Sequence, residues 1–133
     1  MSIAVVTPYS AQRSLLRRRL ARALDRLPPS RVDVRTVDGF QGGEADVVVF
    51  ASTRNNATRN IGFLADARRF NVAFTRARYA LIVLGNGDFL AQGPPECHWR
   101  QWMQHVRQLL LHSEAESRLA HWRHVSQLRL NSS

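Results

Sequence analysis

Three short stretches of this sequence carry side chains that could bind an anionic ligand. They are TPYSAQR at residues 7–13, DGFQGGE at residues 38–44 and ARRFNVAFTRAR at residues 67–78. Arg13 falls in the first stretch, and Arg69 and Arg76 fall in the third. Arginine pairs with phosphate oxygens, and it can neutralise the charge that develops on a transferring phosphoryl group. These residue types favour phosphate chemistry, although each stretch alone also fits a solvated arginine face.

The second stretch is a glycine-rich break between two apolar runs. Gly39, Gly42 and Gly43 let the backbone approach a partner closely or adopt positive φ. Glu44 follows them and could accept hydrogen bonds from a sugar hydroxyl while backbone amides contact phosphate. The same pattern is typical of an ordinary turn, so it decides nothing by itself.

The elements that would position these side chains follow from the apolar pattern. Apolar, β-branched runs predict strands at 2–9, 32–37, 45–53 and 79–86. Helical spacing predicts helices at 10–27, with Ser10 as N-cap, and at 66–78, with Asp66 as N-cap. The inward stripes are predicted to be Leu15, Leu16, Leu20, Ala23, Leu24 and Leu27 in the first helix, and Phe70, Ala73, Phe74 and Ala77 in the second. Residues 54–65 between them are predicted to form a surface loop.

This order of elements predicts an α/β domain with a mainly parallel sheet. Ligands of such sheets bind beyond the carboxyl ends of the strands, where we expect residues 7–13, 38–44 and 52–56 to lie. Arg69 and Arg76 would share one flank of the second helix. The sequence therefore predicts one composite site at the carboxyl edge of the sheet.

The chain changes character towards its end. Residues 98–112 predict an amphipathic helix that packs on the domain edge, and residues 113–130 predict another, with Leu119 and Trp122 inward. The stripe of the helix at 98–112 comprises Trp99, Trp102, Met103, Val106, Leu109 and Leu110. We accordingly divide the chain into a lobe at 1–92 and a helical extension at 93–133. His98, His105 and His112 are spaced too widely to share a zinc ion, and no metal site is expected.

Composition narrows the function further. The chain has 133 residues, a net charge of +9 and nineteen basic residues that are all arginine. The charge indicates an anionic partner, with nucleic acid first among them, and the absence of lysine excludes a G-x-x-x-x-G-K-[ST] phosphate loop within this chain. A single cysteine, Cys97, fits a reducing compartment, and no apolar run is long enough to predict a membrane span.

Taken together, the stretches resemble a known family. VVTPYSAQR, TVDGFQGGEADVVVFASTR and IGFLADARRFNVAFTRARYALIVLGN are similar to motifs IV, V and VI of superfamily 1 helicases, in the branch of the nonsense-mediated mRNA decay helicase. The resemblance covers about residues 3–90 and preserves motif order and spacing. It implies a RecA-like, three-layer α/β domain of the P-loop NTPase type, which would be the second, C-terminal lobe of a helicase.

The resemblance also implies a role for individual residues. Arg76 would be the arginine finger, and Arg13 would sense the γ-phosphate. Glu44 would bind the nucleotide ribose, and Gln41 would lie in the loop that links nucleotide to nucleic acid. Gly43 and Arg69 would complete the cofactor site. The residues expected to face single-stranded nucleic acid are Thr7, Pro8, Tyr9, Thr36 and Phe40.

The same resemblance shows what this chain lacks. Without a phosphate-binding loop or an Asp-Glu pair for Mg²⁺, it should not hydrolyse ATP alone, and ATP with Mg²⁺ would bind only together with a first lobe. Expected partners are single-stranded RNA or DNA and that first lobe, in the same or another polypeptide, in the cytoplasm or nucleus. A non-catalytic binding or docking module remains the alternative, as does a truncated or non-functional reading frame.

Overall fold

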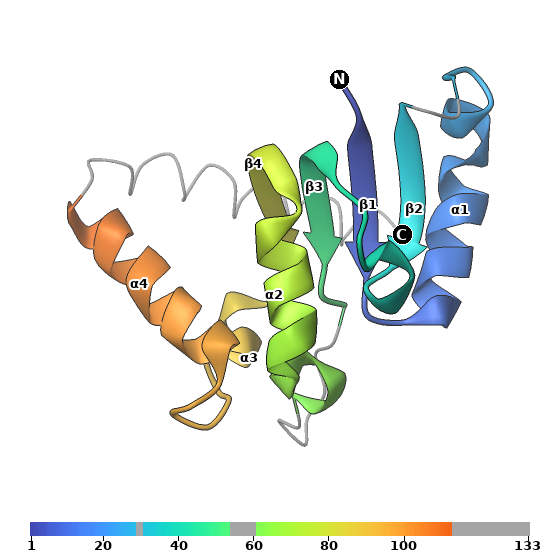
Figure 1. The fold of residues 1–133 in the computed structure, drawn as a ribbon. Helices are drawn as coiled ribbons and strands as arrows, with labels where there is room; N and C mark the ends of the chain where they lie inside the picture. The colour runs from blue at the N-terminus through green and yellow to red at the C-terminus, as the bar shows by residue number, and fades with distance from the viewer. Residues whose placement is uncertain (29–30, 54–60, 113–133) are drawn as a thin grey trace, which may run out of the picture.

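The computed structural model describes residues 1–28, 31–53 and 61–112. Within them the sheet has four strands in the order β2-β1-β3-β4, and every neighbouring pair is parallel (Figure 1). The strands are β1 (Ile3–Thr7), β2 (Val32–Thr36), β3 (Ala45–Ala51) and β4 (Ala77–Leu84). This arrangement confirms the predicted α/β fold with a parallel sheet.

Helices connect and flank the strands. They are α1 (Ser10–Leu24), α2 (Ala67–Thr75), α3 (Gly87–Leu90) and α4 (His98–His112), with short 3-10 turns η1 (Asp38–Phe40) and η2 (Gly62–Ala65). The step from β1 to β2 and the step from β3 to β4 run in opposite directions across the sheet. Because such crossovers are right-handed, α1 and α2 cover opposite faces.

The core lies on the face of the sheet that α2 covers. Ala4, Val6, Val48 and Phe50 are buried and alternate along β1 and β3 with half-buried neighbours, as the two-residue period of a strand requires. Trp99 of α4 is 1% exposed and lies against this face, with its ring centroid 5.0 Å from that of Phe50. The predicted helix at 98–112 is confirmed, and its first half packs on the domain.

The first helix departs from its prediction. It starts after Tyr9, which is the N-cap in place of Ser10, and it ends at Leu24. None of its residues is fully buried, and Leu15 of the predicted inward stripe is 43% exposed. The physical reason is its place at the β2 side of the sheet, where its main contacts are with β1 and β2.

The second helix is shorter than predicted. Asp66 caps it as expected, since its Oδ1 accepts a hydrogen bond of 2.8 Å from the Arg68 amide. The helix ends at Thr75 because β4 already begins at Ala77. Arg76 is therefore the C-cap residue just beyond α2, and whether it shares a flank with Arg69 stays a prediction.

The predicted surface loop at 54–65 is partly core. Ile61 is 7% exposed and Leu64 is 2% exposed, because these apolar side chains belong to the core cluster that also contains Val72 and Cys97. Residues 54–60 and the predicted helix at 113–130, with Leu119 and Trp122, lie outside the described residues. In the part of the chain that the structure covers, no helix is long and apolar enough to cross a membrane.

Candidate nucleotide and nucleic-acid site

Residues 37–44 form a crossover segment between two parallel strands. β2 ends at Thr36 beside Thr7, whereas β3 begins at Ala45, beyond the level of Ile3 at the other end of β1. Because β2 and β3 point the same way, the segment must return from the carboxyl edge of the sheet to the amino edge. Asp38 thus lies at the carboxyl edge and Glu44 at the amino edge, which corrects the prediction that all of DGFQGGE lies at the carboxyl edge.

An aromatic side chain anchors the crossover segment in the core. Phe40 is 6% exposed and belongs to the core cluster together with Ala4 and Val6. Gly43 packs on it so closely that a Cβ at Gly43 would lie 2.9 Å from Phe40 Cε2. Gly42 has a φ of 77°, a conformation that favours glycine. The glycines therefore serve close packing and a turn in this segment.

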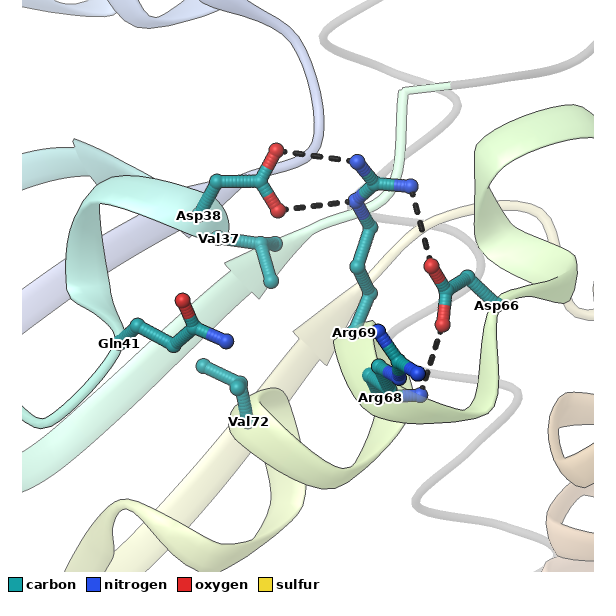
Figure 2. A pocket seen from close by; sticks show the side chains of 7 residues that line it. All are labelled: Val37, Asp38, Gln41, Asp66, Arg68, Arg69 and Val72. Carbon is teal, nitrogen blue, oxygen red and sulfur yellow. Dashed lines mark hydrogen bonds and ion pairs between the residues drawn. The ribbon is translucent and has the colours of Figure 1, made fainter.

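At the carboxyl edge, Arg69 joins the crossover segment to the start of α2 (Figure 2). Its Nε and Nη2 donate to the two carboxylate oxygens of Asp38, both at 3.0 Å, and its Nη1 donates to Asp66 at 3.3 Å. These bonds from Arg69 lower the pKa of Asp38 below its ordinary value of 3.8, and Asp38 in turn raises the pKa of Arg69. The side chain of Arg69 is 24% exposed, whereas that of Asp38 is 66% exposed.

Two hollows flank this ion pair. One hollow has a volume of about 180 Å³, and its polar lining residues include Gln41, Asp66 and Arg68. Figure 2 shows Gln41 across from α2. The other, of about 340 Å³, is lined by Pro8, Tyr9 and the first residues of α1. Asp38 and Arg69 line both hollows. Pro8, Tyr9 and Gln41 thus lie around the ion pair of Asp38 and Arg69.

A second group of charged side chains lies at the amino edge. The amide of Ala45 donates to the carbonyl oxygen of Arg76 at 3.0 Å, which brings Glu44 next to the end of α2. Glu44 accepts hydrogen bonds from Nε and Nη2 of Arg78 at 3.2 and 3.0 Å, and this contact raises the pKa of Arg78. The Nε of Arg76 is buried and has no hydrogen-bond partner among the described residues.

The predicted phosphate-sensing arginines do not come together. Arg13 is exposed in the first turn of α1, which follows the carboxyl end of β1. Arg76 precedes the amino end of β4, and the two strands are parallel within one sheet. Arg13 and Arg76 therefore belong to opposite edges of the domain.

The predicted nucleic-acid residues differ in exposure. Thr7 is 0% exposed, and its hydroxyl donates to Oε1 of Gln12. Thr36 is half-buried, and its Oγ1 accepts a hydrogen bond of 3.1 Å from the Gly39 amide. Since Phe40 is buried as well, only Pro8, Tyr9 and Thr36 in this set offer side-chain surface to a partner.

Sequence reasoning missed Asp38 and Arg78 as parts of these two groups. Both residues lie inside the stretches that were singled out, in DGFQGGE and FTRAR. Their partners are 31 and 34 residues away along the chain, and opposite charge was the only signal in the sequence. Nineteen arginines and ten acidic residues allow too many such pairings for charge alone to select these two.

The parallel sheet with flanking helices is an α/β arrangement of the RecA-like class, consistent with a helicase domain. Residues 1–88 match a family described as AAA domain. The chain is 39% identical over 108 residues to the regulator of nonsense transcripts 1 homolog of Arabidopsis thaliana, covering 80% of this chain and 8% of that protein. It is 44% identical over 88 residues to helicase sen1 of Schizosaccharomyces pombe, covering 66% of this chain and 5% of that protein.

A third relative extends the comparison. The DNA polymerase alpha-associated DNA helicase A of Saccharomyces cerevisiae is 39% identical over 105 residues, which cover 77% of this chain and 15% of that protein. The chain thus belongs to the superfamily 1 helicases, in the branch of the nonsense-mediated mRNA decay helicase, and is a helicase domain. It spans less than a sixth of the length of each of these relatives.

Proposed function

We propose that this domain is the second RecA-like lobe of an ATP-dependent superfamily 1 helicase that acts inside the cell on single-stranded RNA or DNA. In this proposal Arg76 is the arginine finger and Glu44 binds the nucleotide ribose, while ATP and Mg²⁺ are held jointly with a first lobe. Gln41 acts in the loop that links nucleotide to nucleic acid, two residues before Gly43. Arg13, at the edge opposite Arg76, is not part of the γ-phosphate contact made by this domain. The domain alone does not hydrolyse ATP.

One observation carries the proposal. The hydrogen bond from the Ala45 amide to the Arg76 carbonyl joins the crossover segment to the end of α2. It brings Glu44 and Arg76, the two residues with the most specific predicted nucleotide contacts, to the same edge of the lobe. The buried Nε of Arg76, which lacks a partner among the described residues, adds support because a buried donor without a partner is costly.

The grip on nucleic acid is proposed for the carboxyl edge. Pro8, Tyr9 and Thr36 have accessible surface there, and a backbone contact is the available route for Thr7 and Phe40, whose side chains are buried. Together with a net charge of +9, this favours binding to phosphates with little sequence preference.

The test is ATP hydrolysis by the native polypeptide that joins this lobe to a first lobe. Arg76→Ala should lower kcat by about 10³-fold, because an arginine finger stabilises the charge of the transition state. Arg22→Ala, which changes an exposed arginine in the last turn of α1, is the matched control and should leave kcat unchanged. If Arg76→Ala retains kcat and weakens only nucleic-acid affinity, the domain is a binding module.

Binding by the isolated chain provides a second test. Its affinity for a 20-nucleotide single strand should fall as salt rises from low to physiological concentration, because binding to phosphates releases counterions. An affinity that is independent of salt would contradict a phosphate-dominated grip. Comparison of RNA and DNA strands of the same sequence would show which sugar this domain prefers.

A further inference from the structure

The crossover segment and α2 run side by side and are joined at both ends. At one end Asp38 bonds Arg69, and at the other the Ala45 amide bonds the Arg76 carbonyl. Asp38 to Ala45 and Arg69 to Arg76 are both steps of seven residues. Seven helical residues rise about 10 Å, whereas seven extended residues span about 23 Å. The 3-10 turn η1 and the turn at Gly42 shorten the segment, which lets both attachments form.

The attachment at the Arg69 end depends on side chains alone. The guanidinium of Arg69 bonds both oxygens of Asp38 and one oxygen of Asp66, and three bonds fix the orientation of its plane. Asp66 also caps α2 through the Arg68 amide. Figure 2 shows the head group of Arg69 between the two carboxylates. Arg69 therefore faces carboxylates of its own chain, a geometry unlike that of a side chain directed at phosphate.

We propose that Arg69 is a positioning residue, which with Asp38 ties the crossover segment to α2 so that the two edges of the lobe move as one body. The carboxyl edge carries the hollow beside Tyr9, and the amino edge carries Glu44 and Arg76. A displacement of the segment at Asp38 is then transmitted along α2 to Arg76. This assignment replaces the direct cofactor contact that the family resemblance implied for Arg69.

Hydrogen–deuterium exchange of the 133-residue chain tests the attachment without any ligand. The amides of Phe40, Gln41 and Gly43 donate within the segment, and that of Gly39 donates to Thr36 Oγ1 at its start. Asp38→Asn and Arg69→Gln should each speed their exchange by about fivefold, the upper range for an exposed ion pair. The double variant should show no further change, because either single substitution already removes the interaction. Asp88→Asn, which breaks the ion pair with Arg107, is the control and should leave these amides unchanged.

Binding of a 20-nucleotide single strand by the same variants separates positioning from direct contact, and this arm alone rests on the proposed function. Positioning predicts that Asp38→Asn and Arg69→Gln weaken binding alike, although the first raises the net charge and the second lowers it. A direct contact predicts that Asp38→Asn strengthens binding while Arg69→Gln weakens it.

The outcomes distinguish the two proposals. Unchanged exchange in both single variants, or a double variant equal to the product of the two, would overturn the positioning role. Opposite effects of the two substitutions on binding would overturn it as well. If the wild-type chain binds no single strand, the proposed function loses support, while the exchange experiment still decides the role of Arg69.

Discussion

Gly85 and Ser52 lie against each other at the carboxyl ends of β4 and β3, so closely that a Cβ on Gly85 would be 2.0 Å from Ser52 Oγ. The Ser52 amide donates to the carbonyl of Leu84 at 2.9 Å, which holds the two chain segments at this spacing. Ser52 is 0% exposed, so its side chain has no solvent space into which to move. Glycine is therefore required at position 85 by packing.

Gly85→Ala should destabilise the domain by about 1–3 kcal/mol, the usual cost of overpacking a tight site. Chemical denaturation of the isolated chain measures this change in the free energy of unfolding. Adding Ser52→Ala should recover part of the loss, because it removes Oγ but leaves Ser52 Cβ, which is 3.1 Å from the added methyl group. Full stability of Gly85→Ala would show that the two strands separate easily at this point.

Ser52→Ala alone should be neutral or slightly stabilising. Its Oγ is buried and has no hydrogen-bond partner among the described residues, so removing the hydroxyl removes an uncompensated desolvation cost. Thr7→Val offers a comparison, since the Thr7 hydroxyl is equally buried but bonds Gln12. We expect Thr7→Val to cost about 1 kcal/mol in the same denaturation measurement. Equal losses in the two variants would argue against this distinction.

Trp99→Ala should be among the most damaging single changes. The indole is 1% exposed and contacts the rings of Phe50, Phe70, Phe74 and Trp102, so the substitution leaves a large cavity that costs about 3–5 kcal/mol. Leu109→Ala on the same helix should change stability by less than about 0.5 kcal/mol, because Leu109 is 56% exposed. Thermal unfolding compares the two. Similar melting temperatures would mean that α4 does not stabilise the domain.

Acid should weaken the attachment between Asp38 and Arg69. A carboxyl group whose pKa is lowered on folding contributes stability above its ordinary pKa, and that stability is lost as the pH falls through the folded value. The ordinary value for Asp38 is 3.8, and its folded pKa is lower. The stability difference between wild type and Asp38→Asn should therefore persist from pH 7 to about pH 4 and shrink below it. Chemical denaturation at a series of pH values measures this difference. If the difference in the free energy of unfolding stayed constant below about pH 4, the pKa of Asp38 would not be lowered on folding.

Glu44→Gln should separate stability from ligand binding. Glu44 and Arg78 are both exposed, with side chains 52% and 60% accessible, so their ion pair adds little to folding. We expect the free energy of unfolding to change by less than about 1 kcal/mol. If Glu44 binds the ribose, the KM for ATP in the two-lobed polypeptide should rise, whereas Asp88→Asn should leave it unchanged. An unaltered KM would count against the ribose contact.

Local patterns in the sequence were enough for much of this fold. The apolar, β-branched runs predicted four strands within a few residues of their bounds, because such side chains favour the extended backbone of a strand. The amphipathic period predicted α4 over its described residues, His98–His112, and Asp66 was recognisable as a helix cap. The resemblance to motifs IV, V and VI predicted the helicase family, and the family match and the similar helicases confirm it.

The sequence by itself determined the element types, the family and the residues capable of chemistry, since these depend on side-chain identity and near-neighbour spacing. Only the tertiary structure decided which of those residues meet. The parallel direction of β2 and β3 carries Glu44 to the amino edge, away from Asp38 and Arg13, and the early start of β4 removes Arg76 from α2. Strand direction and register are set by contacts between residues far apart in the chain, and a local sequence pattern does not determine those contacts.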